Sequence, residues 1–264
     1  MMRQLAGTAV LRREGAGDAP LVVLLHGIGS RGASWQALIA ALDPRFPVLA
    51  WDAPGYGASA PLTVPPTPAA YAARLAAILD AVAPRPVLLA GHSLGALFAA
   101  AFAARWPARV LAVALISPAA GYRVPAGAAL PPAVQARIDD LARLGPAAFA
   151  AARAPRLLHR PERHPALLAQ VRDTMASIAP AGYADAVHAL GAGDLLADAP
   201  HIAAPTLVAV GAEDAVTPPA GARALFAALS RGLRLVELPD TGHALPQEAP
   251  AKLAALLAEL ASCR

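Results

Sequence analysis

The feature that most constrains the fold is an alternation of short aliphatic runs with helical patterns along the chain. The aliphatic runs have the length and continuous hydrophobicity of strands that are buried on both faces. They are Leu21 to Leu25, Val48 to Trp51, Val87 to Ala90, Val110 to Ile116 and Thr206 to Val210. Between the second and third runs, Thr67 and Pro68 begin a helical pattern that ends before Pro84. Strands that alternate with helices in this way predict an α/β fold with a mostly parallel sheet flanked by helices.

The stretch between Ser117 and Pro205 interrupts this alternation, because it contains no convincing strand. Three segments with helical spacing lie there instead, separated by prolines or glycines: PPAVQARIDDLARLG, PAAFAAARAPRLL and HPALLAQVRDTMASIA. We therefore predict an α/β core of residues 1–120 and 200–264 and an inserted helical cap, or lid, of residues 121–199. In the core, the alternating run LRLVEL (Leu233 to Leu238) predicts a strand near the edge of the sheet, and a final helix is expected from about Pro250 to Leu260.

Composition and charge exclude several classes of protein. The mean hydropathy is +0.48, but much of it comes from alanine, and the longest apolar run, Leu94 to Ala104, is far shorter than the roughly 18 to 20 residues that span a bilayer. The net charge of +4 comes from scattered arginines with a single lysine, Lys252, so we expect neither nucleic acid nor a membrane as partner. The first twenty residues lack the apolar centre of a secretory signal, and the lone Cys263 cannot form an internal disulfide, so a cytoplasmic location is expected.

A polar pentapeptide, GHSLG (residues 91–95), lies between the third aliphatic run and an apolar helical stretch. Burying a polar group without a partner costs roughly 1–3 kcal/mol, so folding alone does not favour a serine there. The pattern G-x-S-x-G between a strand and a helix is typical of a sharp turn that strains the central residue and needs small neighbours. Ser93 is therefore predicted to lie in a cleft as a nucleophile; the alternative is a serine that only caps the following helix.

A serine hydroxyl becomes nucleophilic only beside a base, which is in turn oriented by an acid. GAEDAVTP follows the strand that ends at Val210, and TGHALPQE follows the run that ends at Leu238. Because the carboxyl ends of parallel strands meet at one edge of a sheet, these loops are expected to lie beside Ser93. We predict His243 as the base and Asp214 as the acid, with the adjacent Glu213 as the alternative acid.

Together these motifs resemble the α/β-hydrolase superfamily over nearly the full length. They are LLHGIGSRGASW (Leu24 to Trp35), WDAPGYGAS (Trp51 to Ser59), GHSLGA, GAEDAVTP and TGHALPQEAP. The order Ser93, Asp214, His243 is the order of the triad in that family. The resemblance implies an eight-stranded, mostly parallel sheet, a helical cap inserted after the sixth strand, and no metal or organic cofactor. It also implies an oxyanion hole made by the backbone N–H groups of Leu94 and Ile28, with Gly29 as the alternative to Ile28.

Other residues near these motifs are candidates for structural or substrate-binding roles. His26 and His92 are predicted to be structural, and Asp52 is expected to bind backbone N–H groups in its loop. The candidate pocket residues are Gly29, Tyr122, Arg123, Met175 and Tyr183. Arginines of the cap are suited to hold a substrate carboxylate, because a guanidinium pairs bidentately with such groups, but the sequence does not show which of them face inward.

These features predict a serine hydrolase that cleaves a small or medium carboxylic ester or lactone through an acyl-enzyme intermediate. Two alternatives use the same triad. The first is a carbon–carbon bond (diketone) hydrolase, which is disfavoured because such relatives usually carry asparagine in place of His92. The second is a thioesterase or acyl-carrier esterase, because an acidic acyl carrier would suit a basic cap. Haloalkane and epoxide chemistry is disfavoured, because those relatives use an aspartate in place of Ser93. A non-catalytic ligand receptor is the alternative outside enzymes. The oligomeric state cannot be read from the sequence.

Overall fold

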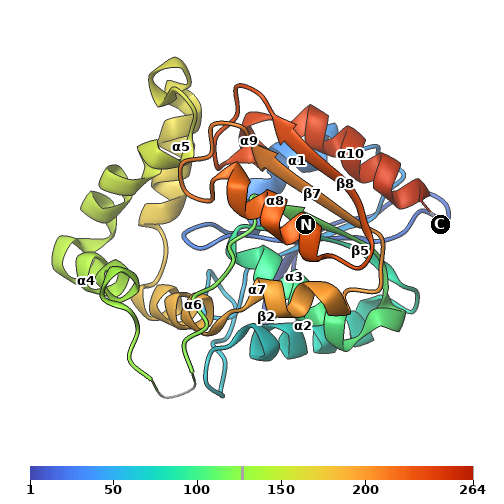
Figure 1. Ribbon diagram of the computed structural model, residues 1–264, viewed down its shortest axis with the longest axis horizontal. Helices are drawn as coiled ribbons and strands as arrows, with labels where there is room; N and C mark the ends of the chain where they lie inside the picture. The colour runs from blue at the N-terminus through green and yellow to red at the C-terminus, as the bar shows by residue number, and fades with distance from the viewer. Residues whose placement is uncertain (126–127, 264) are drawn as a thin grey trace.

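The computed structural model describes residues 1–125 and 128–263. Residues 126–127, within the predicted cap, and Arg264, at the end of the predicted core, lie outside the described residues. Figure 1 shows a central sheet with helices on both sides and a separate group of helices at one end.

In the described part of the chain, eight strands form one sheet with the order β1-β2-β4-β3-β5-β6-β7-β8. Their bounds are β1 (Met2–Leu5), β2 (Thr8–Arg13), β3 (Val22–Leu25), β4 (Val48–Trp51), β5 (Val87–His92), β6 (Val110–Ile116), β7 (Thr206–Gly211) and β8 (Gly232–Leu238). The strands from β3 to β8 pair in parallel, whereas β2 pairs antiparallel with both β1 and β4. The predicted α/β fold with its mostly parallel sheet is confirmed, and β8 lies at the edge as expected.

Helices cover both faces of the sheet (Figure 1). One face packs against α1 (Gln36–Ala41) and α10 (Pro250–Ser262), and the other against α2 (Pro68–Val82), α3 (Leu94–Arg105) and α8 (Pro219–Ala228). The shorter helices are η1 (Gly32–Trp35), η2 (Pro107–Arg109), η3 (Ala154–Leu157), η4 (Pro161–Arg163), α7 (Leu195–Asp198), η5 (Ala199–His201) and α9 (Leu245–Glu248). No helix in residues 1–125 and 128–263 is both long enough and apolar enough to cross a membrane.

The helix that follows GHSLG lies in the centre of the core. Nearly every side chain of α3 is buried, which suits a helix that is apolar almost all round. Its Phe98 ring stacks on Tyr71 of α2 at a centroid distance of 4.2 Å, and Trp51 of β4 packs edge-on against both rings. This packing fixes α3, and therefore the turn at its start, against the sheet.

The helices of the cap follow β6, as the resemblance implies. They are α4 (Pro132–Arg153), α5 (Pro165–Ala176) and α6 (Pro180–Ala192). The first two predicted helical segments meet within α4 at Gly145, just before Pro146. The backbone of Gly145 is not helical, with φ of 74° and ψ of 161°, so α4 consists of two helices joined at a kink, as the sequence predicts. The segments that lead into and out of the cap lie side by side, because the N–H groups of Arg123 and Val124 donate to the carbonyls of Gly193 and Gly191 at 3.0 and 2.9 Å.

Candidate active site

Ser93 lies in the turn between β5 and α3, with φ of 54° and ψ of −115°, a conformation that L-residues rarely adopt. Neighbouring backbone passes very close: a Cβ added at Gly95 would overlap the carbonyl of Leu25, and one at Gly91 would overlap the carbonyl of Gly95. Although Ser93 occupies the N-cap position of α3, its hydroxyl makes no capping hydrogen bond to the described residues. The turn therefore holds the hydroxyl in a strained position without using it for helix capping.

His243 and Asp214 meet at the carboxyl ends of β8 and β7, although 29 residues separate them in the chain. Nδ1 of His243 lies 2.9 Å from Oδ2 and 3.1 Å from Oδ1 of Asp214, and both side chains are buried. Burial alone would raise the pKa of Asp214, but the His243 ring and the Thr217 backbone N–H outweigh it and lower the pKa to about 2. The Asp214 carboxylate is therefore charged at neutral pH, and it can fix the proton of His243 on Nδ1.

Thr217 takes part in this arrangement, although the sequence analysis did not single it out. Its hydroxyl lies 2.9 Å from Oδ2 of Asp214, 3.2 Å from Nδ1 of His243 and 3.0 Å from the carbonyl of Ser117. The backbone N–H groups of Val216 and Thr217 both donate to Oδ1 of Asp214 at 2.8 Å. Thr217 lies within the motif GAEDAVTP, but nothing in its spacing marks its hydroxyl as a partner of Asp214.

The alternative acid, Glu213, points elsewhere. Its Oε2 accepts a hydrogen bond from the backbone N–H of Thr241 at 2.9 Å. The two residues lie in a turn, in which the N–H of Asp214 donates to the carbonyl of Gly211 at 3.2 Å, and their carboxylates have different partners. The structure thus brings Asp214 to His243 and leaves Glu213 on the other side of the loop.

Glu248 of α9 is a further carboxylate near His243 that the sequence analysis missed. Its Oε1 accepts from the N–H of His159 in the cap at 2.7 Å, and its Oε2 accepts from the N–H of Gly242 at 3.0 Å. Burial raises the pKa of Glu248 to about 7, although these two N–H groups oppose the rise. Glu248 therefore links the loop that carries His243 to the cap.

The loop after β3 approaches Ser93 closely. A Cβ added at Gly27 would lie 2.9 Å from the Cβ of Ser93, so glycine is needed there. Within the described part of the chain, the backbone N–H groups of Ile28 and Leu94 have no hydrogen-bond acceptor, and both residues line the cavity that contains Ser93. Two unpaired donors beside a serine are the arrangement that stabilises an oxyanion.

Polar side chains hold this loop in place. His26 donates from Nδ1 to the carbonyl of Gly27 and accepts at Nε2 from the N–H of Ala53, both at 2.9 Å. Asp52 was expected to bind backbone N–H groups of its own loop, but its Oδ1 accepts from the N–H of Gly32 at 2.7 Å and so ties the loop after β3. Burial lowers the pKa of His26, which keeps the ring neutral and able to accept.

His92 supports the backbone of His243. Its Nε2 donates to the His243 carbonyl at 2.8 Å, and the two ring centroids lie 4.9 Å apart. Burial, followed by the nearby His243, lowers the pKa of His92 to about 3. A permanently neutral ring with this contact fits the structural role that the sequence analysis assigned to it.

A cavity of about 770 Å³ lies between the sheet and the cap. Ser93, His243, Ile28 and Leu94 line it from the sheet side. The candidate pocket residues Gly29, Tyr122, Met175 and Tyr183 also line it.

Arg123 differs from the other candidate pocket residues. In the described part of the chain it is not one of the lining residues; its guanidinium pairs with Asp194 at 3.1 Å and is 60% exposed. Other arginines of the cap, Arg137, Arg153 and Arg156, line the cavity instead. Which arginines point into the cavity depends on how the cap helices pack, and helical spacing alone does not reveal this.

Across residues 1–125 and 128–263, no three His, Cys, Asp or Glu side chains come together as metal ligands.

The chain matches the Alpha/beta hydrolase family over residues 22–256, and it belongs to that family. It is 33% identical over 236 residues to the pimeloyl-(acyl-carrier protein) methyl ester esterase of Chromobacterium violaceum, covering 88% of this chain and 90% of that protein.

Solved structures of known enzymes are similar over almost the full length. The enol-lactonase from Burkholderia xenovorans is 31% identical with a TM-score of 0.86, over 98% of this chain and 99% of that one. A thermophilic esterase from Thermogutta terrifontis is 26% identical with a TM-score of 0.85, over 98% and 97%. The chain is thus an enzyme of this family that acts on ester bonds.

Proposed function

We propose that this enzyme is a serine hydrolase that cleaves a small or medium carboxylic ester or lactone through an acyl-enzyme intermediate on Ser93. The observation that carries the proposal is that one cavity contains a strained serine, a histidine bonded to a buried carboxylate, and two unpaired backbone N–H groups. The cavity volume of about 770 Å³ lies within the roughly 300–1,000 Å³ typical of small-molecule sites.

In the first half of the reaction, Ser93 Oγ attacks the ester carbonyl while Nε2 of His243 takes its proton. Nδ1 of His243 keeps its own proton in the hydrogen bond to Asp214, whose negative charge stabilises the imidazolium that forms. The N–H groups of Ile28 and Leu94 donate to the oxyanion of the tetrahedral intermediate. His243 then protonates the leaving alkoxide, and the acyl group remains on Ser93.

In the second half, a water molecule takes the place of the alcohol. His243 removes a proton from the water as it attacks the acyl carbonyl, and the same two N–H groups hold the second oxyanion. Collapse of this intermediate releases the carboxylic acid, and His243 returns the proton to Ser93 Oγ. In a lactone the acid and the alcohol remain one molecule, a hydroxy acid.

A second candidate function is the hydrolysis of an ester whose acyl group is attached to an acyl-carrier protein. It is supported by the 33% identity to a pimeloyl-(acyl-carrier protein) methyl ester esterase. The same residues would perform the chemistry, and the acyl chain would enter the cavity from outside. Tyr122, which lines the cavity and is 45% exposed, lies where cavity and solvent meet. Hydrolysis of a carrier-bound methyl ester with a much higher kcat/KM than the same ester of the free acid would favour this candidate.

The test is kcat/KM on p-nitrophenyl esters of increasing acyl length, measured beside Ser93→Ala. A maximum at one acyl length that disappears in Ser93→Ala supports the proposal. Ester hydrolysis that persists unchanged in Ser93→Ala, with the variant folded, would contradict it. Faster cleavage of a vinylogous diketone than of any ester would point to the carbon–carbon bond alternative. A ligand recovered uncleaved after tight binding would point to the receptor alternative.

A further inference from the structure

The side of the cavity formed by the cap is positively charged. Arg137, Arg153 and Arg156, here called the arginine cluster, line the same cavity as Ser93. We infer that the ester or lactone hydrolysed by this enzyme carries a second group, a carboxylate, which the arginine cluster binds while the ester carbonyl lies at Ser93. This inference rests on the proposed function, and it adds the chemical class of the substrate.

The bend of α4 brings the cluster together. Arg137 and Arg153 are 16 residues apart, and in a straight helix with a rise of 1.5 Å per residue they would lie about 24 Å apart. The bend at Gly145 folds the helix so that both side chains line one cavity, and Arg156 follows in η3. Burial lowers the pKa of Arg153 most, and the charges of Arg137 and Arg156 lower it further, although Tyr183 and Asp140 oppose the fall.

An aromatic ring, rather than a paired carboxylate, lies against the guanidinium of Arg153. The guanidinium carbon of Arg153 lies 5.0 Å from the ring centroid of Phe149, and Phe149 packs edge-on against Tyr183 with centroids 5.3 Å apart. Burial raises the pKa of Tyr183, while Arg153 and Arg137 oppose the rise, so both arginines lie near its hydroxyl. Stacking on an aromatic face holds a guanidinium in place without neutralising it, which leaves its charge and its N–H donors for a ligand.

The cluster lacks the counter-charge that three other arginines of the cap possess. Arg123 pairs with Asp194, Arg143 with Asp140, and Arg172 with Asp173. In the described part of the chain, by contrast, no ion pair involves any member of the cluster.

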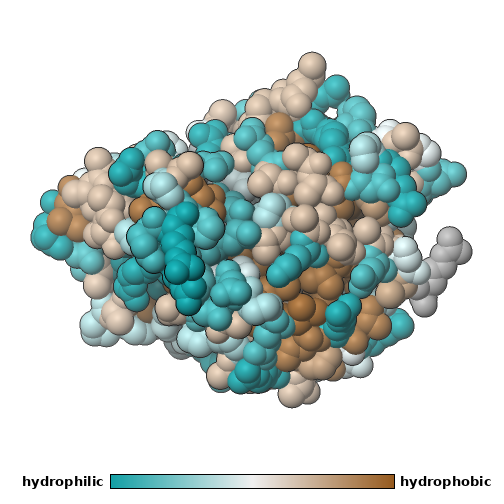
Figure 2. Space-filling view, turned by 90° about the horizontal axis from the view of Figure 1, so that it is seen from above, coloured by the Kyte–Doolittle hydropathy of each residue, from teal (hydrophilic) through white to brown (hydrophobic). Residues whose placement is uncertain are grey.

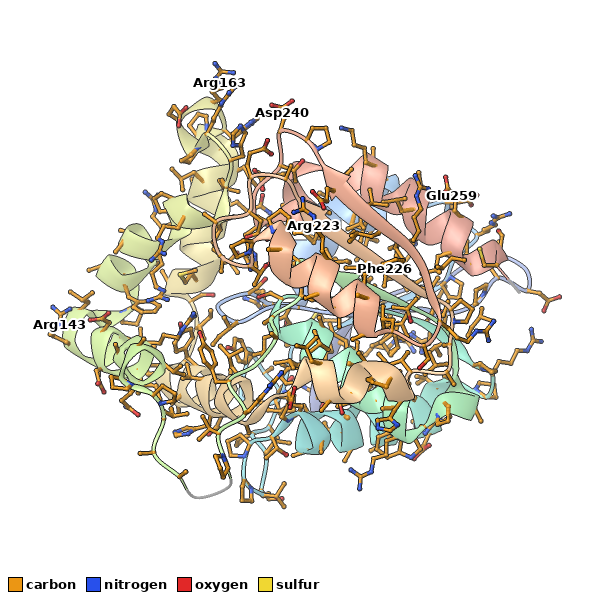
Figure 3. All side chains as sticks on the ribbon, in the orientation of Figure 1. Arg143, Arg163, Arg223, Phe226, Asp240 and Glu259 are labelled. Carbon is orange, nitrogen blue, oxygen red and sulfur yellow. The ribbon has the colours of Figure 1, made fainter. Side chains whose placement is uncertain are left out.

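One carboxylate, Asp140, is found among the described residues that line the cavity, and its Oδ1 accepts from Arg143 at 2.7 Å. Figure 3 shows Arg143 at the outer tip of the cap. Asp140 itself lines the cavity, and its charge raises the pKa of Arg153. Figure 2 shows hydrophilic and apolar residues interspersed over the end of the molecule that the cap forms. Among the described residues, three arginines and one carboxylate line the cavity. The cavity therefore keeps an excess of positive charge when it is empty.

An anionic group on the substrate balances this charge. A carboxylate can accept two parallel hydrogen bonds from one guanidinium, and hydrogen bonds between charged groups are stronger than neutral ones. Because the cluster and Ser93 line the same cavity of about 770 Å³, the carboxylate and the scissile ester must belong to one small or medium molecule. Half-esters of dicarboxylic acids and lactones that bear a carboxylate meet this requirement.

The test compares methyl esters that share one chain and differ only at the far end. They are methyl hexanoate, which is neutral, monomethyl adipate, which ends in a carboxylate, and methyl 6-aminohexanoate, which ends in an ammonium. We expect kcat/KM for monomethyl adipate to exceed that for methyl hexanoate by roughly 10- to 100-fold at low salt, with the ammonium ester the poorest. Added salt should reduce this preference, because it screens partly exposed charges.

Arg137→Gln and Arg153→Gln are each expected to reduce the preference for the carboxylate ester by several-fold. The matched control is Arg172→Gln on α5, which removes the same charge from the cap but lies outside the residues that line the cavity; it should keep the preference and the activity. If either cluster variant misfolds, Arg156→Gln tests the same site, because that side chain is exposed and little packing depends on it.

The outcomes separate this inference from the proposed function. Hydrolysis that depends on Ser93 but shows equal kcat/KM for the carboxylate and the neutral ester overturns the inference and leaves the proposed function standing. A preference that is unchanged in Arg153→Gln and Arg156→Gln also overturns it. If none of the esters is hydrolysed in a way that depends on Ser93, the proposed function fails, and the inference fails with it.

Discussion

Asp214→Asn should leave the fold intact and remove most of the turnover, and the hydrogen bonds around Asp214 explain why. Its Oδ1 accepts the backbone N–H groups of Val216 and Thr217 at 2.8 Å each. An asparagine must place its amide oxygen at this position, because an NH₂ group there would face two donors. The amide nitrogen then occupies the position of Oδ2, which lies 2.9 Å from Nδ1 of His243.

An amide nitrogen at that position can only donate. It therefore favours the tautomer of His243 in which Nδ1 accepts and Nε2 carries the proton, and this tautomer cannot take the proton of Ser93. The expected loss in kcat is about 10⁴-fold, or about 5.4 kcal/mol at 1.36 kcal/mol per factor of ten. The loss in stability should be smaller, about 1–2 kcal/mol, because one charge-assisted hydrogen bond becomes a neutral one.

The assay is steady-state kcat on a neutral p-nitrophenyl ester, with circular dichroism and thermal unfolding to verify the fold. The matched control is Glu213→Gln, which changes the neighbouring carboxylate but leaves His243 untouched, because Glu213 faces the N–H of Thr241. A folded Asp214→Asn with near-native kcat would refute the tautomer explanation. A large loss in Glu213→Gln alone would move the acid role to Glu213.

The remaining predictions concern the surroundings of the triad and the turn that carries Ser93. Thr217→Val keeps the shape of the side chain but removes the hydroxyl beside Asp214 and His243. We expect kcat to fall about tenfold, which corresponds to about 1.4 kcal/mol. An unchanged kcat would show that the backbone N–H groups alone position the carboxylate of Asp214. The pKa of Glu248 is about 7 in the folded chain, whereas its usual value is 4.5. Between these two pH values the folded chain binds a proton at Glu248 that the unfolded chain has lost. The stability that this protonation provides is therefore lost as the pH rises from about 4.5 to about 7. Thermal unfolding should therefore depend less on pH across that window in Glu248→Gln, and an identical dependence would contradict the shift. Gly95→Ala should destabilise by more than about 3 kcal/mol in chemical denaturation, because its Cβ would overlap the carbonyl of Leu25, whereas Gly221→Ala in α8, with open space around it, should be neutral or stabilising.

The sequence predicts strands well where they are buried on both faces. Every residue of β3, β4 and β7 is buried, and such continuous aliphatic runs are visible without any knowledge of their neighbours. The hairpin of β1 and β2 was not predicted from its residues, because Met2, Arg3 and Gln4 are exposed and carry no apolar pattern. β2 of this hairpin pairs antiparallel with β4, and only its first three residues are buried.

Chemical roles that depend on loop position are visible in the sequence, whereas roles that depend on side-chain direction are not. Ser93, Asp214 and His243 were selected because each follows a predicted strand, and the structure brings Asp214 and His243 into contact. By contrast, the hydrogen bonds of Thr217 and Glu248 have a geometry that only the folded loops define. The arginine cluster depends on the angle between the two parts of α4 that meet at Gly145. Helical spacing predicts each part, but it does not predict the angle between them.

The cap is attached to the core at several points around the site. The N–H of Ala244, next to His243, donates to the carbonyl of Leu157 in η3 at 2.8 Å, and Glu248 accepts from the N–H of His159 just beyond it. On the other side, Gly182 of α6 lies so close to Gly55 that an added Cβ would overlap the Gly55 carbonyl.

Because Leu157 directly follows Arg156, these attachments hold the backbone of Arg156, one member of the arginine cluster, near His243. A carboxylate held by a fixed cluster positions the ester carbonyl at one distance from it, and reaction requires the reacting atoms to be within about 3–3.5 Å. Among half-esters of increasing length, kcat/KM should therefore show a narrow maximum, whereas neutral esters, which lack this second attachment, should show a broad one.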